Sequence, residues 1–157
     1  MLIVHFKYTI SNMKINRLYL VLIFCLITYG SQAQERYSII PFPNKLIKGE
    51  GFFEIKSKLS ITLSKHFLSE LPLMTLVLAD DYQIELVQNP NGKLNFRFNN
   101  QLNKDEYILN VCPDSISVEA STSTGCFWAF QTVRQLMNLT GKGTYRIGSC
   151  HIEDKPT

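Results

Sequence analysis

Residues 105–139 read DEYILNVCPDSISVEASTSTGCFWAFQTVRQLMNL. Apolar and polar side chains alternate over 107–111 and again over 116–120, and a period of two is typical of β-strands. Between these runs, Pro113-Asp114-Ser115 favours a tight turn, because proline presets φ and the aspartate can hydrogen-bond to the backbone that follows. The first half of the stretch therefore predicts a hairpin whose second strand buries one face and wets the other.

The second half of the stretch changes to helical spacing. A helix is predicted over 125–139, with the hydroxyl of Thr122 or Ser123 as its N-cap. Its apolar stripe consists of Cys126, Phe130, Val133 and Met137, with Phe127, Ala129, Leu136 and Leu139 beside them. Its other face carries Gln131, Arg134, Gln135 and Asn138. A hairpin that leads directly into a core helix is thus expected.

The rest of the chain is read mainly as strands. They are expected at 36–40, 52–55, 59–63, 83–87, 93–98 and 144–152. Gly49-Glu50-Gly51 is interpreted as a turn, and Pro41 and Pro43 as the end of the first strand. Asn89-Pro90-Asn91-Gly92 predicts a hairpin between strands 83–87 and 93–98.

A second helix is expected from His66 to Ala79, because apolar residues recur there at helical spacing. Ser64 is its candidate cap, and Pro72 indicates either irregular first turns or a separate helix that starts there. Groups of strands with two helices between them indicate an α+β fold. The length of 157 residues leaves room for a single domain.

The first 33 residues have the pattern of a signal peptide. Lys14 and Arg17 supply a positive region, an apolar run follows over 18–29, and Ser31-Gln32-Ala33 is a small-x-small cleavage site before Gln34. The apolar run is shorter than the roughly 20 helical residues that span a bilayer, so no stable membrane anchor is expected.

We therefore expect export to the periplasm or the extracellular space, with cleavage between Ala33 and Gln34. The mature domain would be 34–157, and Met13 is a candidate for the true start of translation.

The balance of charge in the sequence limits the kinds of partner that the domain is expected to bind. Three of the 16 basic residues, Lys7, Lys14 and Arg17, precede residue 34, which leaves 13 basic residues against 13 acidic ones. A neutral mature domain without a basic cluster is not expected to bind nucleic acid or an anionic membrane surface.

Three cysteines lie beyond the predicted signal peptide: Cys112, Cys126 and Cys150. Export permits disulfides, and a bridge between Cys112 and Cys126 is one alternative. Burial of all three as unpaired core residues is the interpretation that we favour.

Three segments carry a resemblance when they are taken in order. The first runs from Ile39 to Pro43 and continues with Lys48-Gly49-Glu50-Gly51-Phe52, and the second is the hairpin and helix of 106–136. The third is Ile152-Glu153-Asp154-Lys155-Pro156-Thr157. Together they resemble the N-terminal domain of family 20 glycoside hydrolases, the β-N-acetylhexosaminidases.

The resemblance implies a mainly antiparallel sheet with two helices packed on one face. It also implies a partner, the catalytic (β/α)8 barrel, which in the family would begin after Thr157. Those enzymes remove terminal β-linked N-acetylglucosamine or N-acetylgalactosamine with the help of the substrate's own 2-acetamido group, an Asp that orients it and a Glu that serves as acid and base. We expect an accessory domain of a secreted enzyme, without a cofactor and inactive by itself.

Two alternatives stay open. The chain could be a stand-alone module that binds a glycan or a protein, or it could precede the barrel of another glycosidase. The DNA downstream of codon 157 would distinguish a fragment from a stand-alone module.

No residue of the chain is predicted to be catalytic, substrate-binding or metal-ligating. Asp105-Glu106 has the spelling of the family's catalytic dipeptide, but it opens a hairpin strand and lacks the preceding His-x-Gly-Gly run. Asp80-Asp81 fits a solvated loop, and Glu153-Asp154 belongs to the segment that leaves the domain.

The histidines and aromatic residues are given structural roles as well. His66 lacks a Cys or His at metal-ligand spacing, and the polarity of a loop explains His151 beside Glu153 and Asp154 better than ion binding does. Three aromatic residues of the predicted helix are assigned to the core rather than to a sugar-stacking platform: Phe127, Trp128 and Phe130. Phe127 and Phe130 lie at core spacing, whereas Trp128 is offset from them and could face either way.

Overall fold

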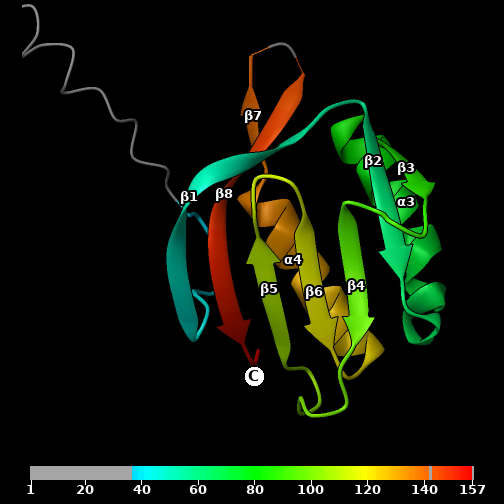
Figure 1. Ribbon diagram of the computed structural model, residues 1–157, viewed down its shortest axis with the longest axis vertical. Coiled ribbons are helices and arrows are strands. Elements are labelled where there is room, and N and C mark those ends of the chain that lie inside the picture. Colours follow the sequence, from blue (N-terminus) through cyan, green and yellow to red (C-terminus); the bar gives the residue numbers. More distant parts are fainter. Residues whose placement is uncertain (1–36, 142, 157) are drawn as a thin grey trace, which may run out of the picture. The chain divides into compact units, whose positions relative to one another are not determined.

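Eight strands form one mixed sheet in the computed structural model, which describes residues 37–141 and 143–156 (Figure 1). The predicted signal peptide and its cleavage site at Ala33 and Gln34 lie outside the described residues. The elements in chain order are β1 (Lys45–Ile55), β2 (Lys58–Leu63), the 3-10 helix η1 (Lys65–Glu70), α3 (Leu71–Tyr82), β3 (Glu85–Gln88), β4 (Leu94–Phe98), β5 (Tyr107–Val111), β6 (Ile116–Ala120), α4 (Ser123–Leu136), β7 (Asn138–Thr140) and β8 (Thr144–Asp154).

The strands lie in the order β1-β8-β5-β6-β4-β2-β3, and β7 pairs with β8. The pairs of β8 with β1, β5 and β7 are antiparallel, as is β5 with β6. β4 runs parallel to β6 and to β2, and β2 runs parallel to β3. Figure 1 shows α3 and α4 on one side of this sheet, so the expected α+β fold with a mainly antiparallel sheet and two helices is confirmed.

The hairpin of 105–139 forms as expected. Tyr107 pairs with Ala120 and Val111 with Ile116, so both strands turn the same alternate residues towards the helices. The N-cap is Thr122, whose Oγ1 accepts a hydrogen bond from the backbone N of Gly125 at 3.1 Å.

The helix ends three residues earlier than predicted, at Leu136. The following residues, Asn138–Thr140, form the strand β7 and pair with the first residues of β8. They can do so because β8 extends beyond its pairing with β5, which covers only residues 150–154 of β8. Leu139 is consequently 66% exposed on a strand instead of lying in the apolar stripe of a helix.

The predicted hairpin between 83–87 and 93–98 is wrong. Both strands pair with β2 instead: Ile61 of β2 lies opposite Gln88 of β3 on one side and opposite Leu94 of β4 on the other. The turn itself exists, since the backbone N of Gly92 donates to the carbonyl O of Asn89 at 3.0 Å. It carries the chain across β2 rather than back along β3.

The start of the domain also differs from the prediction. Residues 37–40 form no strand, and the first strand begins at Lys45. Gly49-Glu50-Gly51 is a bulge inside β1, because Lys48 pairs with Cys150 and Phe52 with Gly148, so three residues face Ser149 alone. Two glycines in a row of three favour either a turn or a bulge, and only the partner strand decides between them.

Pro72 separates two helices, as one of the two sequence alternatives predicted. η1 precedes it, and Pro72 occupies the first turn of α3, where its missing N–H is not needed. Ser64 is the N-cap residue of η1, as predicted, but its side chain makes no capping hydrogen bond. Its carbonyl O instead accepts a hydrogen bond from the backbone N of Phe67 at 2.9 Å. Asp80 and Asp81 lie in the last turn of α3 rather than in a loop.

The core fills the space between the sheet and the two helices. Its largest fully buried side chains are those of Tyr107, Phe53, Phe67, Phe96, Phe130, Ile55, Ile61, Met74, Leu78, Ile84, Leu94 and Leu109. No helix in the described part of the chain is long and apolar enough to cross a membrane.

Candidate functional site

The dipeptide Asp105-Glu106 has a structural role. Glu106 Oε2 accepts hydrogen bonds from the backbone N and the side-chain Nδ2 of Asn103, at 2.8 and 2.7 Å. These hydrogen bonds lower the pKa of Glu106 below its ordinary value. Asp105 has a φ of 69°, in the left-handed region. The two residues close the loop that leads into β5.

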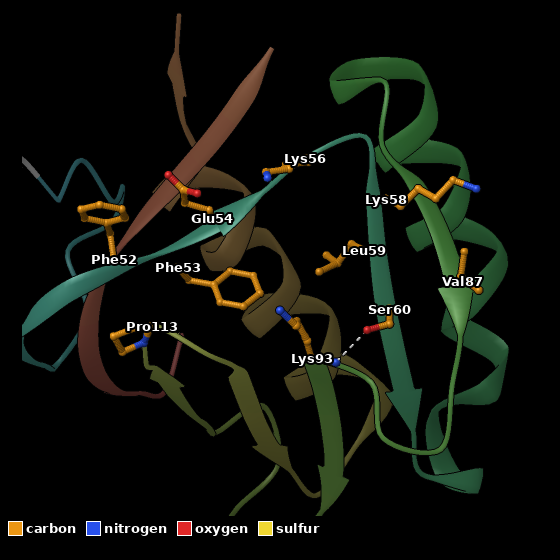
Figure 2. Close-up of a pocket in the computed structure, with 10 residues that line it drawn as sticks. All are labelled: Phe52, Phe53, Glu54, Lys56, Lys58, Leu59, Ser60, Val87, Lys93 and Pro113. Carbon is orange, nitrogen blue, oxygen red and sulfur yellow. Dashed lines mark hydrogen bonds between the residues drawn. The ribbon is translucent and has the colours of Figure 1, made fainter. Parts of the chain in front are cut away.

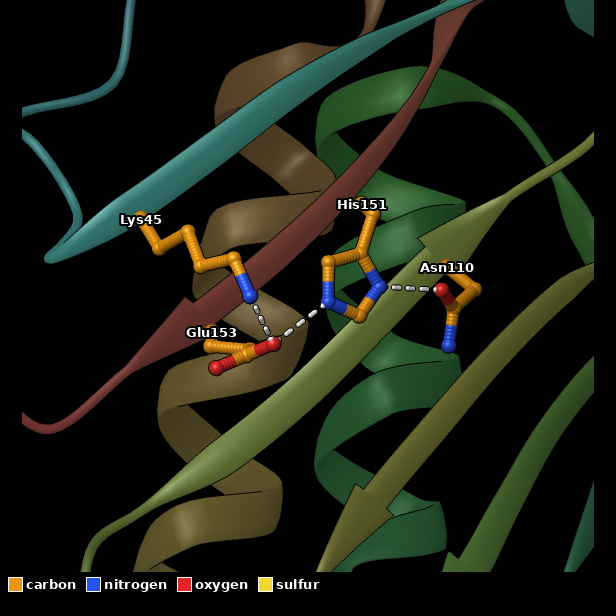
Figure 3. Close-up of polar contacts among 4 residues, drawn as sticks. All are labelled: Lys45, Asn110, His151 and Glu153. Atoms are coloured by element: carbon orange, nitrogen blue, oxygen red, sulfur yellow. Dashed lines mark hydrogen bonds and ion pairs between the residues drawn. The ribbon is translucent and has the colours of Figure 1, made fainter.

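The two histidines in the described part of the chain are engaged separately. His66 stacks on Phe98, with 4.0 Å between ring centroids. His151 lies in strand β8 and not in a loop, and Figure 3 shows it between Asn110 and Glu153. Asp154 points to the opposite face of the same strand, because successive side chains of a strand alternate.

No group of three or more potential ligands that could hold a metal ion exists among the described residues. Of its two acidic neighbours in sequence, His151 contacts Glu153, whose Oε1 lies 2.8 Å from His151 Nε2.

The cysteines occupy three different places. Cys126 is buried in α4 and Cys150 in β8, as expected, but Cys112 is exposed at the end of β5, so its assignment to the core is wrong. No disulfide joins Cys112 to Cys126. Burial raises the pKa of the Cys126 thiol to about 12.

Of the three aromatic residues of α4, only Phe130 is fully buried. Phe127 is half-buried and meets the ring of Trp128 edge-on, with 5.3 Å between centroids. Trp128 is 40% exposed, so its assignment to the core is wrong. Its face of α4 instead lines a groove.

This groove, which we call the exit groove, has a volume of about 320 Å³ and lies where the N-terminal and C-terminal ends of the described chain meet α4. It is lined by Ile39, Ile40, Pro41, Phe42, Asn44, Tyr107, Trp128, Gln131, Thr132, Gln135, Asp154, Lys155 and Pro156. The contribution of α4 follows from helical spacing, because residues 128, 131, 132 and 135 share one side of the helix.

Asn44 and Asp154 join the two ends of the described chain. The backbone N of Asn44 donates to Asp154 Oδ1 at 3.0 Å, and the backbone N of Lys155 donates to Asn44 Oδ1, also at 3.0 Å. Further along, the backbone N of Ile40 donates to Gln135 Oε1 of α4 at 2.7 Å. The segment before β1 is thus fixed to both β8 and α4.

A buried chain of hydrogen bonds supports the floor of the exit groove. The hydroxyl oxygens of Tyr107 and Thr132 are 2.7 Å apart, and the Tyr107 hydroxyl also donates to Asp154 Oδ2 at 3.3 Å. With one proton each, Thr132 donates to Tyr107 and Tyr107 donates to Asp154, so both protons are used. Burial raises the pKa of Tyr107 well above its ordinary value, and the negative charge of Asp154 adds to this effect.

The rim of the exit groove is apolar and exposed. Ile40 is 79% exposed, Phe42 71% and Trp128 40%, and Pro156 stands beside them. The floor of the exit groove is thus polar and hydrogen-bonded, and its rim is apolar and exposed. Exposed apolar surfaces of this kind are typical of sites where proteins interact.

Sequence reasoning missed this site. The segment 152–157 carries part of the family resemblance. Two residues that hydrogen-bond to its Asp154 lie far from it in sequence, however: Tyr107 and Asn44. An inward-facing tyrosine in a strand was the one available signal, because a buried tyrosine hydroxyl needs a hydrogen-bond partner.

Comparison with curated protein sequences finds no significant match. Solved structures do match. The exo-β-N-acetylglucosaminidase of family GH20 from Vibrio harveyi, in complex with N-acetylglucosamine, is 26% identical with a TM-score of 0.71, over 75% of this chain and 19% of that chain.

Two further structures have the same fold at lower identity. A β-N-acetylhexosaminidase from Bacteroides fragilis is 22% identical, with a TM-score of 0.65, over 76% of this chain and 25% of that chain. The N-acetyl-β-hexosaminidase from Streptomyces plicatus is 22% identical, with a TM-score of 0.61, over 75% of this chain and 26% of that chain. The chain therefore spans between 19% and 26% of the length of these three proteins.

The sequence profile of one family matches nearly all of the described chain. The match covers residues 36–155, and the family is described as glycosyl hydrolase family 20, domain 2. With the fold shared by the hexosaminidase structures, this match shows that the chain belongs to the glycosyl hydrolase family 20, domain 2 family.

Proposed function

We propose that this chain is the accessory N-terminal domain of an exported β-N-acetylhexosaminidase and that its exit groove packs against the catalytic barrel. The family match over residues 36–155 supports the first part of the proposal. The share of the Vibrio harveyi enzyme that the chain matches, 19%, supports a role as one part of a larger protein.

The exit groove is the observation that supports the docking role. Lys155 and Pro156 line it, so a polypeptide that continues beyond residue 157 would leave the domain beside the apolar rim. Ile40, Phe42 and Trp128 would lose their contact with water in such an interface, at a gain of about 25 cal/mol for each Å² of apolar surface buried. The hydrogen bonds beneath them hold the floor in one shape before docking.

The reaction that we propose for the whole enzyme is removal of terminal β-linked N-acetylglucosamine or N-acetylgalactosamine with retention. The Asp that orients the acetamido group and the Glu that transfers protons would both belong to the barrel. Glu106 is held by Asn103 in the loop before β5, so we assign it no part in this chemistry. We expect the chain alone to be inactive and to need no cofactor.

Export is part of the same proposal. It rests on the positive region, the apolar run and the small-x-small site that end at Ala33. Mass spectrometry of the secreted protein should find Gln34 at the N-terminus. Recovery of the protein from the cytoplasm with residues 14–29 intact would contradict export.

The function is tested at the native gene and by enzymology. The reading frame downstream of codon 157 should encode a family 20 catalytic domain, and the protein made from the whole locus should release the chromophore from a chromogenic N-acetylglucosaminide. The chain of 157 residues should show no turnover above a heat-treated control. A clean stop codon at this point in several related strains would favour the stand-alone module instead.

Glu106→Gln separates the two interpretations of the Asp105-Glu106 pair. We expect this variant to leave the activity of the protein from the whole locus unchanged, because Glu106 is turned to Asn103. Activity of the isolated chain that disappears in Glu106→Gln would overturn the assignment.

A further inference from the structure

A second groove, of about 680 Å³, opens between the β1–β2 connection and the β5–β6 turn (Figure 2). We call it the lysine groove and define it by Phe53, Lys56, Lys58, Leu59, Ser60 and Lys93. It exists because β1 and β2 are consecutive in sequence but lie far apart in the sheet order, so the chain crosses from one to the other above the β5–β6 turn. Its volume falls in the range of about 300–1,000 Å³ that small-molecule sites occupy.

The floor and one wall of the lysine groove are apolar. Phe53 and Leu59 are buried core residues that present part of their surface to it, and Pro113 of the β5–β6 turn stands at the side. Phe52 lies at the edge, where the guanidinium of Arg146 covers its ring at 4.0 Å from the centroid. Such a surface suits the C–H faces of a sugar ring as well as any apolar group.

Only some of the charged residues that line the lysine groove have an ion-pair partner. Lys58 pairs with Glu85 at 2.8 Å, and Figure 2 shows its side chain extended towards β3, away from the middle of the groove. Glu54, the one acid in the lining, is already held by Arg146, whose Nη2 and Nε lie 2.6 and 2.9 Å from Glu54 Oε1.

Lys56 and Lys93 have no such partner. Among the residues that the structure describes, neither forms an ion pair, and Figure 2 shows the Lys93 side chain directed into the groove beside the ring of Phe53. Lys56 belongs to the β1–β2 connection and Lys93 directly precedes β4, so the groove has a lysine on each of two separate segments of its lining. They leave two positive charges without a counter-charge.

Ser60 adds a neutral hydrogen-bond donor. Its Oγ accepts a hydrogen bond from the backbone N of Lys93 at 3.0 Å, as the dashed line in Figure 2 shows. Because this bond uses a lone pair of the hydroxyl oxygen, the O–H remains able to donate to a ligand.

We propose that the lysine groove binds a short acidic saccharide. Its sulfate or carboxylate groups contact Lys56 and Lys93, its hydroxyls reach Ser60, and one ring face packs on Phe53 and Pro113. Ammonium groups bind such anions by charge-assisted hydrogen bonds, which are about twice as strong as neutral ones. This site does not depend on whether a catalytic barrel follows the domain.

The charge distribution favours a saccharide over a nucleic acid. A protein that follows a phosphate backbone needs many basic contacts along a stripe. This groove offers two unpaired lysines, and the domain from residue 34 onward carries equal numbers of basic and acidic residues. An apolar floor next to a few charges fits a small ligand with one or two anionic groups.

The test is titration calorimetry on the purified protein with four probes: a chondroitin sulfate disaccharide, the neutral disaccharide N,N′-diacetylchitobiose, inorganic sulfate and a single-stranded oligonucleotide. The sulfated disaccharide should bind most tightly, and its affinity should fall as salt is added. The double variant Lys56→Gln/Lys93→Gln should lose at least about tenfold in affinity, which corresponds to about 1.4 kcal/mol. Lys104→Gln, which removes an exposed lysine outside the groove, should bind as the parent protein does.

Four outcomes of the comparison between probes would overturn the proposal. They are absence of binding, equal binding of the neutral disaccharide, equal binding of inorganic sulfate and tighter binding of the oligonucleotide. An equal loss in Lys104→Gln would also overturn it, because the effect would then reflect overall charge. Unchanged melting temperatures of the variants will show that each is folded.

Discussion

Gly92 lies against the backbone of Thr62. The backbone N of Gly92 donates to Thr62 Oγ1 at 2.7 Å, and a Cβ at Gly92 would stand 2.5 Å from the backbone N of Thr62 and clash with the carbonyl carbon of Ile61. The chain between β3 and β4 thus touches the main chain of β2 as it passes over it. Only glycine leaves room for this crossing.

Gly92→Ala should therefore destabilise the protein by about 1–3 kcal/mol or more, the usual cost of forcing extra atoms into a packed place. Urea unfolding followed by circular dichroism measures the change. Gly141→Ala is the matched control, because a Cβ added there meets no non-adjacent atom of the described residues within 4 Å. Its effect should stay within about 0.5 kcal/mol. Equal midpoints for the two variants would contradict the crossing.

The same crossing shows which part of the fold the sequence could predict. The turn at Asn89-Pro90-Asn91-Gly92 is a local signal and was found. The insertion of β2 between β3 and β4 is a non-local pairing that no residue of the turn records. The β5–β6 hairpin and the cap at Thr122 were predicted correctly because both depend on neighbours in sequence.

The core helix gives a second prediction. Phe130 is 1% exposed, and Phe130→Ala would leave a cavity that costs about 3–5 kcal/mol. Thr124→Ala, at an exposed position of the same helix, should change the free energy of unfolding by no more than about 0.5 kcal/mol. Gln135 is unsuitable as a control, because its Oε1 accepts a hydrogen bond from Ile40. Comparable urea midpoints for Phe130→Ala and Thr124→Ala would show that α4 does not pack on the sheet as described.

The cysteines give a third prediction. The thiolate is the reactive form of cysteine, and burial raises the pKa of Cys126 to about 12. In the native protein, iodoacetamide at about pH 8 should modify exposed Cys112 quickly and Cys126 and Cys150 slowly. Peptide mass spectrometry after timed quenching measures the three rates, and the protein unfolded in urea should lose the difference. Native modification of Cys126 as fast as Cys112 would contradict its burial.

Glu153 makes the stability of the folded protein depend on pH in the acidic range. In Figure 3, Glu153 Oε1 faces both His151 and Lys45. It lies 2.8 Å from His151 Nε2 and 2.6 Å from Lys45 Nζ, and these two hydrogen bonds lower the pKa of Glu153, the one with His151 more than the one with Lys45. A carboxylate whose pKa is lower in the folded protein stabilises the fold above its unfolded pKa of about 4.3, and this contribution is lost as the pH falls through the lowered value.

Glu153→Gln should consequently lower the melting temperature near neutral pH, and the gap to the parent protein should close in acid. Glu50→Gln, which removes an exposed carboxylate from the β1 bulge, serves as the control for net charge. Thermal melts from about pH 7 down to about pH 3 bracket the ordinary carboxyl range. A gap that stays constant over this range would show that the hydrogen bonds of Glu153 do not stabilise the fold.

The exit groove was beyond prediction from sequence for a physical reason. Trp128 lies beside the apolar stripe of α4, and its burial depends on what covers that side of the helix. The segment 39–42 approaches this side through the bond from Ile40 to Gln135, a contact across 95 residues that leaves the indole partly open. Helical spacing alone does not distinguish such a flank from the core.

The exposed rim of the exit groove gives the last prediction. Phe42 and Trp128 together present a large apolar surface, and surfaces of this kind associate in water when no partner covers them. The isolated chain should therefore self-associate with rising concentration in analytical ultracentrifugation, and Phe42→Gln/Trp128→Gln should sediment as a monomer over the same range. Leu139→Gln is the matched control, since Leu139 is 66% exposed on β7 and outside the exit groove.

In the protein made from the whole locus, the double variant should instead lower the melting temperature, because there the same side chains would be covered by the barrel. If association persists in the double variant, or disappears in Leu139→Gln, the chain associates through another surface. The support for docking at the exit groove would then be lost.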